Sequence, residues 1–373
     1  MDSEAAKVTP YEVNGRVDYD ILVNQFGVSL ITPELLSRIE KDAGELHYLL
    51  RRKIFFAHRD LNWLLDQYEN GKKFVLYTGR GPSGPVHLGH LIPWMFTKWL
   101  QDKFGAELYF QMTDDEKFLF NDRLTLDQTK KYAYENVLDI IALGFDPKKT
   151  HIFLDTEYAK TMYNQAIRVA KHITLSTVKA SFGFQDSDNI GIAFYTSMQA
   201  VPAILASAKE GKSVPCLIPL AIDQDPHFRV ARDVYPKLGY PKPALIESKF
   251  IPGLGPGGKM SASDPNSAIF VTDTPEQAVK KVMNAFTGQQ ATAELQRRLG
   301  GNPDICSVCQ YYVFLFEQDD AKLKVILDRE RSGDILAGEH KADLAERVKS
   351  FLADHQRRRE KAKDHVEEFM LRD

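Results

Sequence analysis

Apolar residues follow two alternating patterns from about residue 73 onward. Short apolar runs of strand length are each followed by a longer segment in which apolar residues recur with the spacing of an amphipathic helix. The predicted strands are 74–78, 107–113, 151–156 and 216–222, and the predicted helices are 90–104, 125–144 and 225–238. Because strands alternate with helices, we predict an α/β fold with a Rossmann-like parallel sheet.

The two ends of the chain follow other patterns. Near the N-terminus, Asn14-Gly15 between apolar arms favours a hairpin turn, and helices are predicted at 33–43 and 60–68. After Pro265 the strand signals fade and helical spacing dominates. We therefore predict an N-terminal extension, a Rossmann-like catalytic domain and an α-helical C-terminal domain. Their ranges are 1–70, 71–270 and 271–373, and the C-terminal helices are expected at 275–286, 291–299, 305–317, 320–330 and 338–370.

Composition narrows the class of protein. The 373 residues are 43% hydrophobic and 27% charged, which excludes disordered and fibrous classes. Three cysteines are too few for a disulfide framework, the N-terminus does not resemble a signal peptide, and no apolar run has the length of a membrane span. We therefore expect a cytoplasmic protein without membrane association. The formal net charge of −3 argues weakly against a polyanionic partner, although basic clusters occur at 51–53 and 355–363.

A glycine-rich stretch separates the first predicted strand from the first predicted helix of the sheet. Gly79, Gly81 and Gly84 match the GxGxxG fingerprint of dinucleotide sites, so an NAD-dependent dehydrogenase is one alternative. Pro82 lacks the backbone amide that such a loop would offer to a pyrophosphate. The motif alone is therefore weak evidence.

Two histidines follow this stretch. His87 and His90 flank Gly89 where the predicted strand passes into its helix, and the spacing places both on one side of the first turn. A metal site would need further ligands, and no HExxH or paired CxxC motif accompanies them. We therefore predict no metal there and expect the histidines and the helix N-terminus to bind phosphate.

A second glycine-rich stretch, 253–263, nearly matches a phosphate-binding P-loop. It contains Lys259, Ser261 and Ser263, but Met260 stands where a P-loop has the Ser or Thr that ligates magnesium. It also precedes the helical region instead of joining the first strand to the first helix. We interpret it as a clamp on phosphate oxygens, with a solvated linker as the alternative.

Together, the two stretches resemble the signature motifs of class I aminoacyl-tRNA synthetases. The motifs are PSGPVHLGH at 82–90 and KMSAS at 259–263. The intervening segments QMTDDEKFLF, FGFQDSD and AIDQDPHFR are similar to those of tryptophanyl-tRNA synthetases of the archaeal and eukaryotic type. Tyrosyl-tRNA synthetase is the closest competitor, but Pro202 stands where that family carries the carboxylate that binds the substrate hydroxyl, which favours tryptophan.

The resemblance implies the substrates and their ligands. L-Tryptophan would react with ATP to give tryptophanyl-adenylate and pyrophosphate, and its acyl group would pass to tRNA(Trp), with AMP released. It also implies Mg²⁺ accompanying ATP, a homodimer and a helical region that reads the anticodon. The residues implied for tryptophan are Tyr77, Gln111, Glu116, Gln199 and Gln224, those for catalysis are His87, His90, Lys259, Ser261 and Ser263, and those for ATP are Gly79, Gly81, Pro82, Ser83, His87, Gly89, His90, Lys259, Met260 and Ser261.

Several assignments stay open at this level. Four aspartates, Asp114, Asp115, Asp223 and Asp225, are consistent with either substrate contacts or helix caps. Cys306-Ser-Val-Cys309 forms one CxxC pair, for which packing at a helix start is favoured, a disulfide is an alternative, and zinc would need distant ligands. A non-catalytic RNA-binding relative is a further alternative, although the chain retains both histidines and the lysine of the two motifs.

Overall fold

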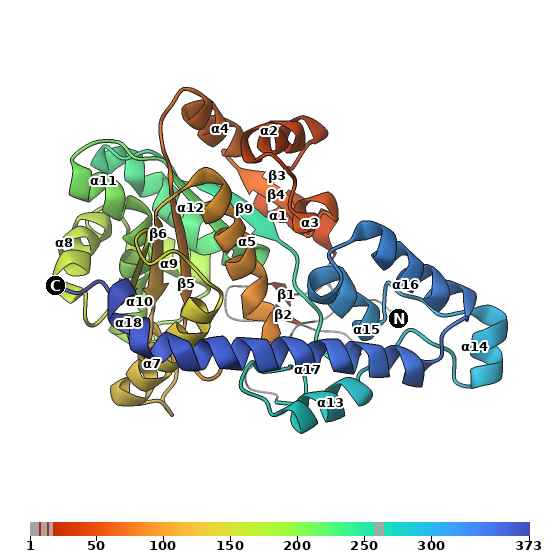
Figure 1. Cartoon of the computed structure of the whole chain (residues 1–373). Coiled ribbons are helices and arrows are strands. Elements are labelled where there is room, and N and C mark those ends of the chain that lie inside the picture. The colour runs from red at the N-terminus through yellow and green to blue at the C-terminus, as the bar shows by residue number, and fades with distance from the viewer. Residues whose placement is uncertain (1–6, 9–12, 15–17, 257–259, 261–264) are drawn as a thin grey trace.

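The computed structural model describes residues 7–8, 13–14, 18–256, 260 and 265–373. Its centre is a seven-stranded sheet with the order β3-β4-β9-β8-β5-β6-β7 (Figure 1). The strands from β9 to β7 are parallel, whereas β3 and β4 form an antiparallel edge. The strands are β3 Ser29–Leu30, β4 Phe55–Arg59, β5 Val75–Arg80, β6 Leu108–Met112, β7 Thr150–Leu154, β8 Cys216–Ala221 and β9 Ala244–Ser248.

The parallel part of the sheet is buried on both faces. Every residue of β6 is buried, so helices must cover both sides of it, as the continuous apolar pattern of this strand predicts. The α/β fold predicted from the sequence is confirmed. The helices of this region are α5 Leu88–Phe104, α6 Asp114–Phe120, α7 Leu126–Ala142, α8 Ala159–Ala170, α9 Leu175–Phe182, α10 Ile190–Gln199, η1 Pro202–Ile204, α11 Leu205–Glu210, η2 Ile222–Gln224, α12 Asp225–Val234 and η3 Tyr235–Leu238.

The N-terminal segment contributes to the sheet as well as covering it. Strand β4 pairs with β9, so this segment is more closely joined to the parallel sheet than an extension would be. A two-stranded hairpin is present, but Asn14 pairs with Lys7 and lies within its second strand, so the predicted turn position is wrong. The elements here are β1 Lys7–Val8, β2 Val13–Asn14, α1 Tyr19–Phe26, α2 Pro33–Ala43, α3 Tyr48–Arg51 and α4 Leu61–Glu69.

The C-terminal region is helical, and its longest helix reaches the sheet. Figure 1 shows α17 running from the C-terminal helices to the sheet, where the chain ends. The backbone N–H of Leu371 donates to the carbonyl of Ile152 in edge strand β7 at 2.7 Å. The helices are α13 Pro275–Met283, α14 Ala293–Leu299, α15 Ser307–Tyr311, the π-helix η4 Tyr312–Phe316, α16 Asp320–Ser332, α17 Ala337–Ala362, η5 Lys363–His365 and α18 Val366–Phe369.

Both basic clusters noted in the sequence are partly used to hold the fold together. Arg51 and Arg52 each lie 2.7 Å from a carboxylate oxygen of Asp320, which joins the N-terminal segment to α16. Arg359 of α17 lies 2.9 Å from Asp139 of α7 and is mostly buried. These three arginines therefore contribute to tertiary structure, and the free basic surface is smaller than the sequence suggests.

One apolar stretch has the length of a membrane span. Ile190–Glu210 meets the length and composition criteria, contrary to the expectation from the sequence, but 67% of its apolar window is buried inside the protein. The stretch is divided into α10, η1 and α11, with Pro202 at the start of η1. Core helices of globular proteins have the same composition, so this stretch is weak evidence for a membrane span.

Candidate active site

The predicted site residues surround one cavity at the carboxyl ends of the parallel strands. The cavity has a volume of about 520 Å³ and opens where β5 has β8 on one side and β6 on the other. From β5 the chain adds β6 and β7 on one side of the sheet and β8 and β9 on the other. Open α/β sheets bind ligands at the point where this direction changes. The predicted residues that line it are Tyr77, Gly79, Gly81, Ser83, His87, Gly89, His90, Glu116, Gln199, Gln224 and Met260. Gln111 lies behind this lining, and Pro82 is buried outside it.

A directional chain of hydrogen bonds forms one wall of the cavity. The Tyr77 hydroxyl donates to Gln111 Oε1 at 2.6 Å and accepts from Gln199 Nε2 at 2.7 Å. Gln111 Nε2 in turn donates to both carboxyl oxygens of Asp155 at 2.9 Å, and Gln199 Oε1 accepts from the Tyr195 hydroxyl. Burial raises the pKa of Tyr77 well above its ordinary value, so its hydroxyl remains a donor.

This chain leaves one polar position open on Tyr77. A tyrosine hydroxyl has one proton to donate and two lone pairs to accept with. The proton is committed to Gln111 and one lone pair to Gln199, and Tyr77 itself lines the cavity. The remaining lone pair can accept one hydrogen bond from a neutral N–H or O–H of a ligand.

A pair of hydrogen-bonded carboxyl groups, Asp155 and Asp115, fixes the far end of the chain. Burial, together with the nearby charge of Asp115, raises the pKa of Asp155 well above its ordinary value. Burial also raises the pKa of Asp115 to about 6, although its hydrogen bond with Asp155 acts in the other direction. The buried Asp155 and the partly buried Asp115 hold one proton between them, because two like charges in contact would repel each other there. The pair thereby orients the Gln111 amide.

Glu116 supplies a negative charge on another side of the cavity. Burial alone would raise the pKa of its carboxyl. The ammonium of Lys117 at 2.7 Å and the hydroxyl of Thr113 at 2.5 Å together outweigh this effect, so the net pKa lies below its usual range. Glu116 is therefore ionised at neutral pH. A buried carboxylate of this kind can bind a ligand ammonium.

The N-terminus of α5 presents donors to the cavity. The backbone N–H of His87 donates to His90 Nδ1 at 3.1 Å, so the proton of a neutral His90 ring lies on Nε2. The two rings stack with centroids 3.6 Å apart. A Cβ at Gly89 would lie 3.0 Å from His87 Nδ1, so glycine leaves room for this ring. Ring N–H groups and free helix amides are suited to an anionic ligand.

The segment that follows the second motif is attached to the first. Residues 86–88 and 269–271 exchange backbone hydrogen bonds of 2.9 and 3.0 Å. Met260 is buried and lines the cavity, so the second motif reaches the same site as the histidines. Three predicted residues of this motif lie outside the described part of the chain: Lys259, Ser261 and Ser263.

Comparison with known proteins identifies the family. The model of class I tRNA synthetases for tryptophan and tyrosine matches residues 69–353. The chain belongs to this family. A protein of Pyrobaculum calidifontis named tryptophan–tRNA ligase is 53% identical over 371 residues, covering 100% of this chain and 99% of its own. One of Saccharolobus solfataricus with the same name is 51% identical over 364 residues, covering 97% and 94%. The crystal structure of Plasmodium falciparum tryptophanyl-tRNA synthetase has a TM-score of 0.88 at 41% identity, covering 95% of each chain. The resemblance seen in the sequence is thus confirmed.

The synthetase site contains a cation that sequence reasoning missed. Arg80 stands between Gly79 and Gly81 of the first stretch and lines the cavity. Its Nε donates to Asn136 at 3.2 Å, whereas its buried Nη2 has no hydrogen-bond partner among the described residues. Burial lowers the pKa of Arg80 to about 10, which leaves it charged at neutral pH. Its position inside a phosphate-type loop was the signal that could have identified it.

Two of the four ambiguous aspartates have structural roles. Asp225 is paired with Arg59 at 2.6 Å, which joins α12 to β4, and Asp114 accepts from the backbone and hydroxyl of Thr156. Asp115 is hydrogen-bonded to Asp155 and does not line the cavity, whereas Asp223 does and is therefore the remaining candidate for substrate contact.

Proposed function

We propose that this synthetase activates L-tryptophan with ATP to tryptophanyl-adenylate and pyrophosphate, then transfers the tryptophanyl group to tRNA(Trp) and releases AMP. The observation that carries the proposal is the convergence of two distant motifs on one cavity: the N-terminus of α5 and Met260 both line it, beside the acceptor on Tyr77. The names of the relatives at 53% and 51% identity support the same substrates.

Tryptophan would be held by complementary polar groups. Its indole N–H has one proton to donate, and the open lone pair of Tyr77, oriented by Gln111, is the acceptor that we assign to it. Glu116 would bind the ammonium, and the amides of Gln199 and Gln224 would orient the carboxylate. A site built around one donor rejects phenylalanine, because that substrate would leave the acceptor unpaired.

ATP would place its phosphates at the N-terminus of α5. Donors from His90 Nε2, the glycine loop and Arg80 would neutralise the phosphates, while Lys259 and Ser261 of the second motif would close over the β and γ phosphates. Magnesium would enter with ATP as part of the nucleotide substrate. The tryptophan carboxylate then attacks the α-phosphorus and the bond to pyrophosphate breaks. No protein nucleophile is needed, so catalysis consists of orientation and charge stabilisation.

The second step and the assembly follow from the same proposal. The helical C-terminal region would recognise the anticodon of tRNA(Trp), and the active form would be a homodimer in the cytoplasm. Single-stranded RNA bases are bound by stacking and by hydrogen bonds to their edges. The exposed arginines 357 and 358 on α17 are candidates for phosphate contacts.

The test is amino-acid-dependent ATP–pyrophosphate exchange with tryptophan, tyrosine and phenylalanine in parallel. We expect exchange with tryptophan alone, followed by charging of tRNA(Trp) transcripts. Exchange with tyrosine and none with tryptophan would overturn the substrate assignment. Exchange without any tRNA charging would overturn the second step only.

A further inference from the structure

Four buried side chains that could ligate a metal meet in the C-terminal helical region. Cys306 and Cys309 come from the start of α15, Glu330 from the end of α16 and His340 from α17. One potential ligand atom from each residue lies within 4.8 Å of the others. All four residues are at most 1% exposed, and none lies in the cavity described above.

Two atoms of this cluster lack a hydrogen-bond partner within the described part of the chain. Glu330 Oε2 accepts from Gln289 Nε2 at 2.6 Å and lies 3.2 Å from His340 Nδ1. Glu330 Oε1 and His340 Nε2 are buried and have no partner among the described residues. An unsatisfied buried polar atom costs about 1–3 kcal/mol, so simple packing or an ion pair explains the cluster poorly.

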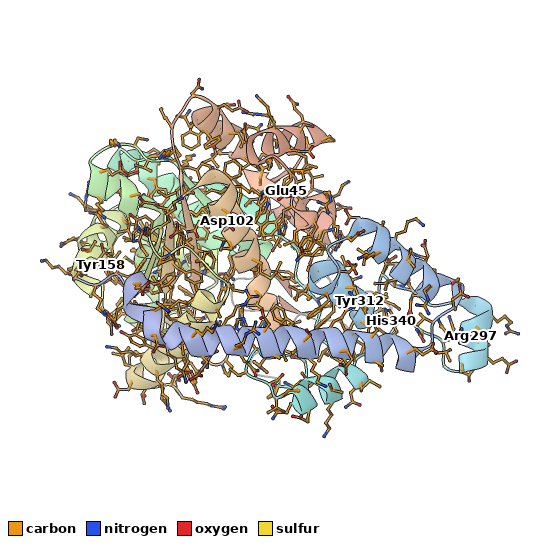
Figure 2. All side chains as sticks on the ribbon, viewed as in Figure 1. Glu45, Asp102, Tyr158, Arg297, Tyr312 and His340 are labelled. Carbon is orange, nitrogen blue, oxygen red and sulfur yellow. The ribbon has the colours of Figure 1, made fainter. Side chains whose placement is uncertain are left out.

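The arrangement of the histidine matches that of a metal ligand. Two ligand atoms of one tetrahedral zinc ion lie about 3.4–3.8 Å apart. His340 Nδ1 and Glu330 Oε2 lie 3.2 Å apart, so both atoms can ligate one ion in place of the proton between them. The ring is also held in place by Tyr312, which stacks on it with centroids 5.3 Å apart; Figure 2 labels the two side chains together.

The backbone around the cluster is tightly packed. The N–H of Gly301 donates to the Glu330 carbonyl at 2.8 Å, and a Cβ on this glycine would lie 2.8 Å from Glu330 Oε1. The N–H of Cys309 points to Cys306 Sγ at 3.4 Å, and both thiols are free. An N–H directed at sulfur stabilises the thiolate form that binds metals. The ligands are thus oriented before any ion binds.

We propose that Cys306, Cys309, Glu330 and His340 form a structural zinc site. Two sulfurs, one imidazole and one carboxylate are four ligands of the kinds that Zn²⁺ takes in tetrahedral sites. Tetrahedral zinc separates such ligands by about 3.4–3.8 Å, so ligand atoms that now lie up to 4.8 Å apart would move about 1.0–1.4 Å closer together on binding. Because the site is closed and buried, the ion serves the fold: it joins α15, α16 and α17. Glu330 and His340 supply the two ligands that the CxxC pair alone lacks.

The test measures zinc bound to the full chain, purified under reducing conditions from zinc-supplemented medium. We expect about one zinc per chain by mass spectrometry of the metal, as for a four-ligand structural site. Cys309→Ser and His340→Gln should lower zinc occupancy at least about tenfold, since each removes a ligand. Cys216→Ala is the matched control, because Cys216 is also buried and free but lies in β8; it should retain the zinc.

A second measurement covers variants that fail to fold. Metal-free wild-type chain titrated with Co²⁺ should develop sulfur-to-cobalt charge-transfer bands and the intense visible bands of tetrahedral cobalt, and added zinc should abolish both. Absence of metal after purification and after zinc addition would overturn the proposal, as would iron in place of zinc or full zinc retention in Cys309→Ser. Pyrophosphate exchange on the same preparation reports the proposed function separately.

Discussion

Removing the Tyr77 hydroxyl is the sharpest test of how the site selects its amino acid. In Tyr77→Phe the ring stays in the core between β5 and α12, where it packs edge-on against Phe228 with centroids 5.8 Å apart. Only the oxygen is lost, together with its hydrogen bonds to Gln111 and Gln199. The substitution therefore removes the proposed indole acceptor without opening a large cavity.

The magnitude follows from counting the hydrogen bonds that are lost. A bound indole N–H would lose its acceptor, and an unsatisfied buried donor costs about 1–3 kcal/mol. Since about 1.4 kcal/mol corresponds to a factor of ten, kcat/KM for tryptophan should fall roughly 10–100-fold. The contact is remote from the α-phosphorus and is present in both ground and transition states, so the loss should appear mainly in KM.

The assay is ATP–pyrophosphate exchange over a range of tryptophan and phenylalanine concentrations. Phenylalanine has no N–H to lose, so its kcat/KM should hardly change and discrimination should fall by the factor lost for tryptophan. Tyr235→Phe is the matched control: its hydroxyl is also buried and donates to the Ala200 carbonyl at 2.6 Å, but Tyr235 does not line the cavity. It should lose thermal stability and keep its tryptophan KM.

Two outcomes would refute this reasoning. An unchanged kcat/KM for tryptophan in Tyr77→Phe would mean that the indole N–H is not bound there. An equal loss for both amino acids, with a similar loss in Tyr235→Phe, would mean that the hydroxyl supports only the fold.

Three further predictions concern other parts of the molecule. Lys259→Ala should lower the exchange rate well over about tenfold with little change in tryptophan binding, because its charge acts on the departing pyrophosphate; quench-flow and equilibrium binding separate the two effects. The double variant Arg357→Ala/Arg358→Ala should weaken tRNA charging and flatten its salt dependence while sparing adenylate formation. Arg359→Ala breaks the ion pair with Asp139 and should instead lower the melting temperature. Asp115→Asn should stabilise the protein by up to about 3 kcal/mol above pH 6 and by little near pH 4. The folded state raises the pKa of Asp115 from about 4 to about 6, so ionising this carboxyl costs the wild-type protein stability as the pH rises between these values. Denaturant melts at both pH values measure the difference.

Four of the five parallel strands were predictable because they carry a strong local signal, whereas β9 was not predicted. Strands β5 to β8 are buried apolar runs bounded by glycine, proline or polar turns, and these features lie within a few residues of one another. Strand β4 was missed: FFAHR follows a basic run and pairs with β9 across nearly 190 residues of chain, so nothing local marks it as a strand. Because the two strands are so far apart in sequence, the pairing of the N-terminal segment with the sheet could not be predicted either.

The candidate site shows the same division between local and distant information. The motifs identified the residues around the phosphates, because helix N-termini and glycine loops act through nearby backbone. Ion pairs could not be predicted in this way. Arg359 and Arg51 belong to the two basic clusters noted in the sequence, but their acidic partners lie 220 and 269 residues away along the chain. A basic cluster on a predicted helix is therefore a surface only if the fold brings no acid to it.

The wall of the cavity explains why a polar chain is buried beside an apolar substrate. A purely apolar pocket would gain as much binding free energy from burying the indole as this one does. It would discriminate poorly against phenylalanine, because aromatic rings of similar shape differ little in burial free energy. From the carboxyl pair at Asp155 through Gln111 to Tyr77, the polar atoms of the chain are hydrogen-bonded to one another, and the Tyr77 hydroxyl keeps one further lone pair for a ligand in the cavity. Because the chain is directional, that last position can only accept. Selectivity for a ring with an N–H therefore depends on the proton arrangement of the whole chain, and a substitution that turns the Gln111 amide should weaken tryptophan binding without touching the substrate.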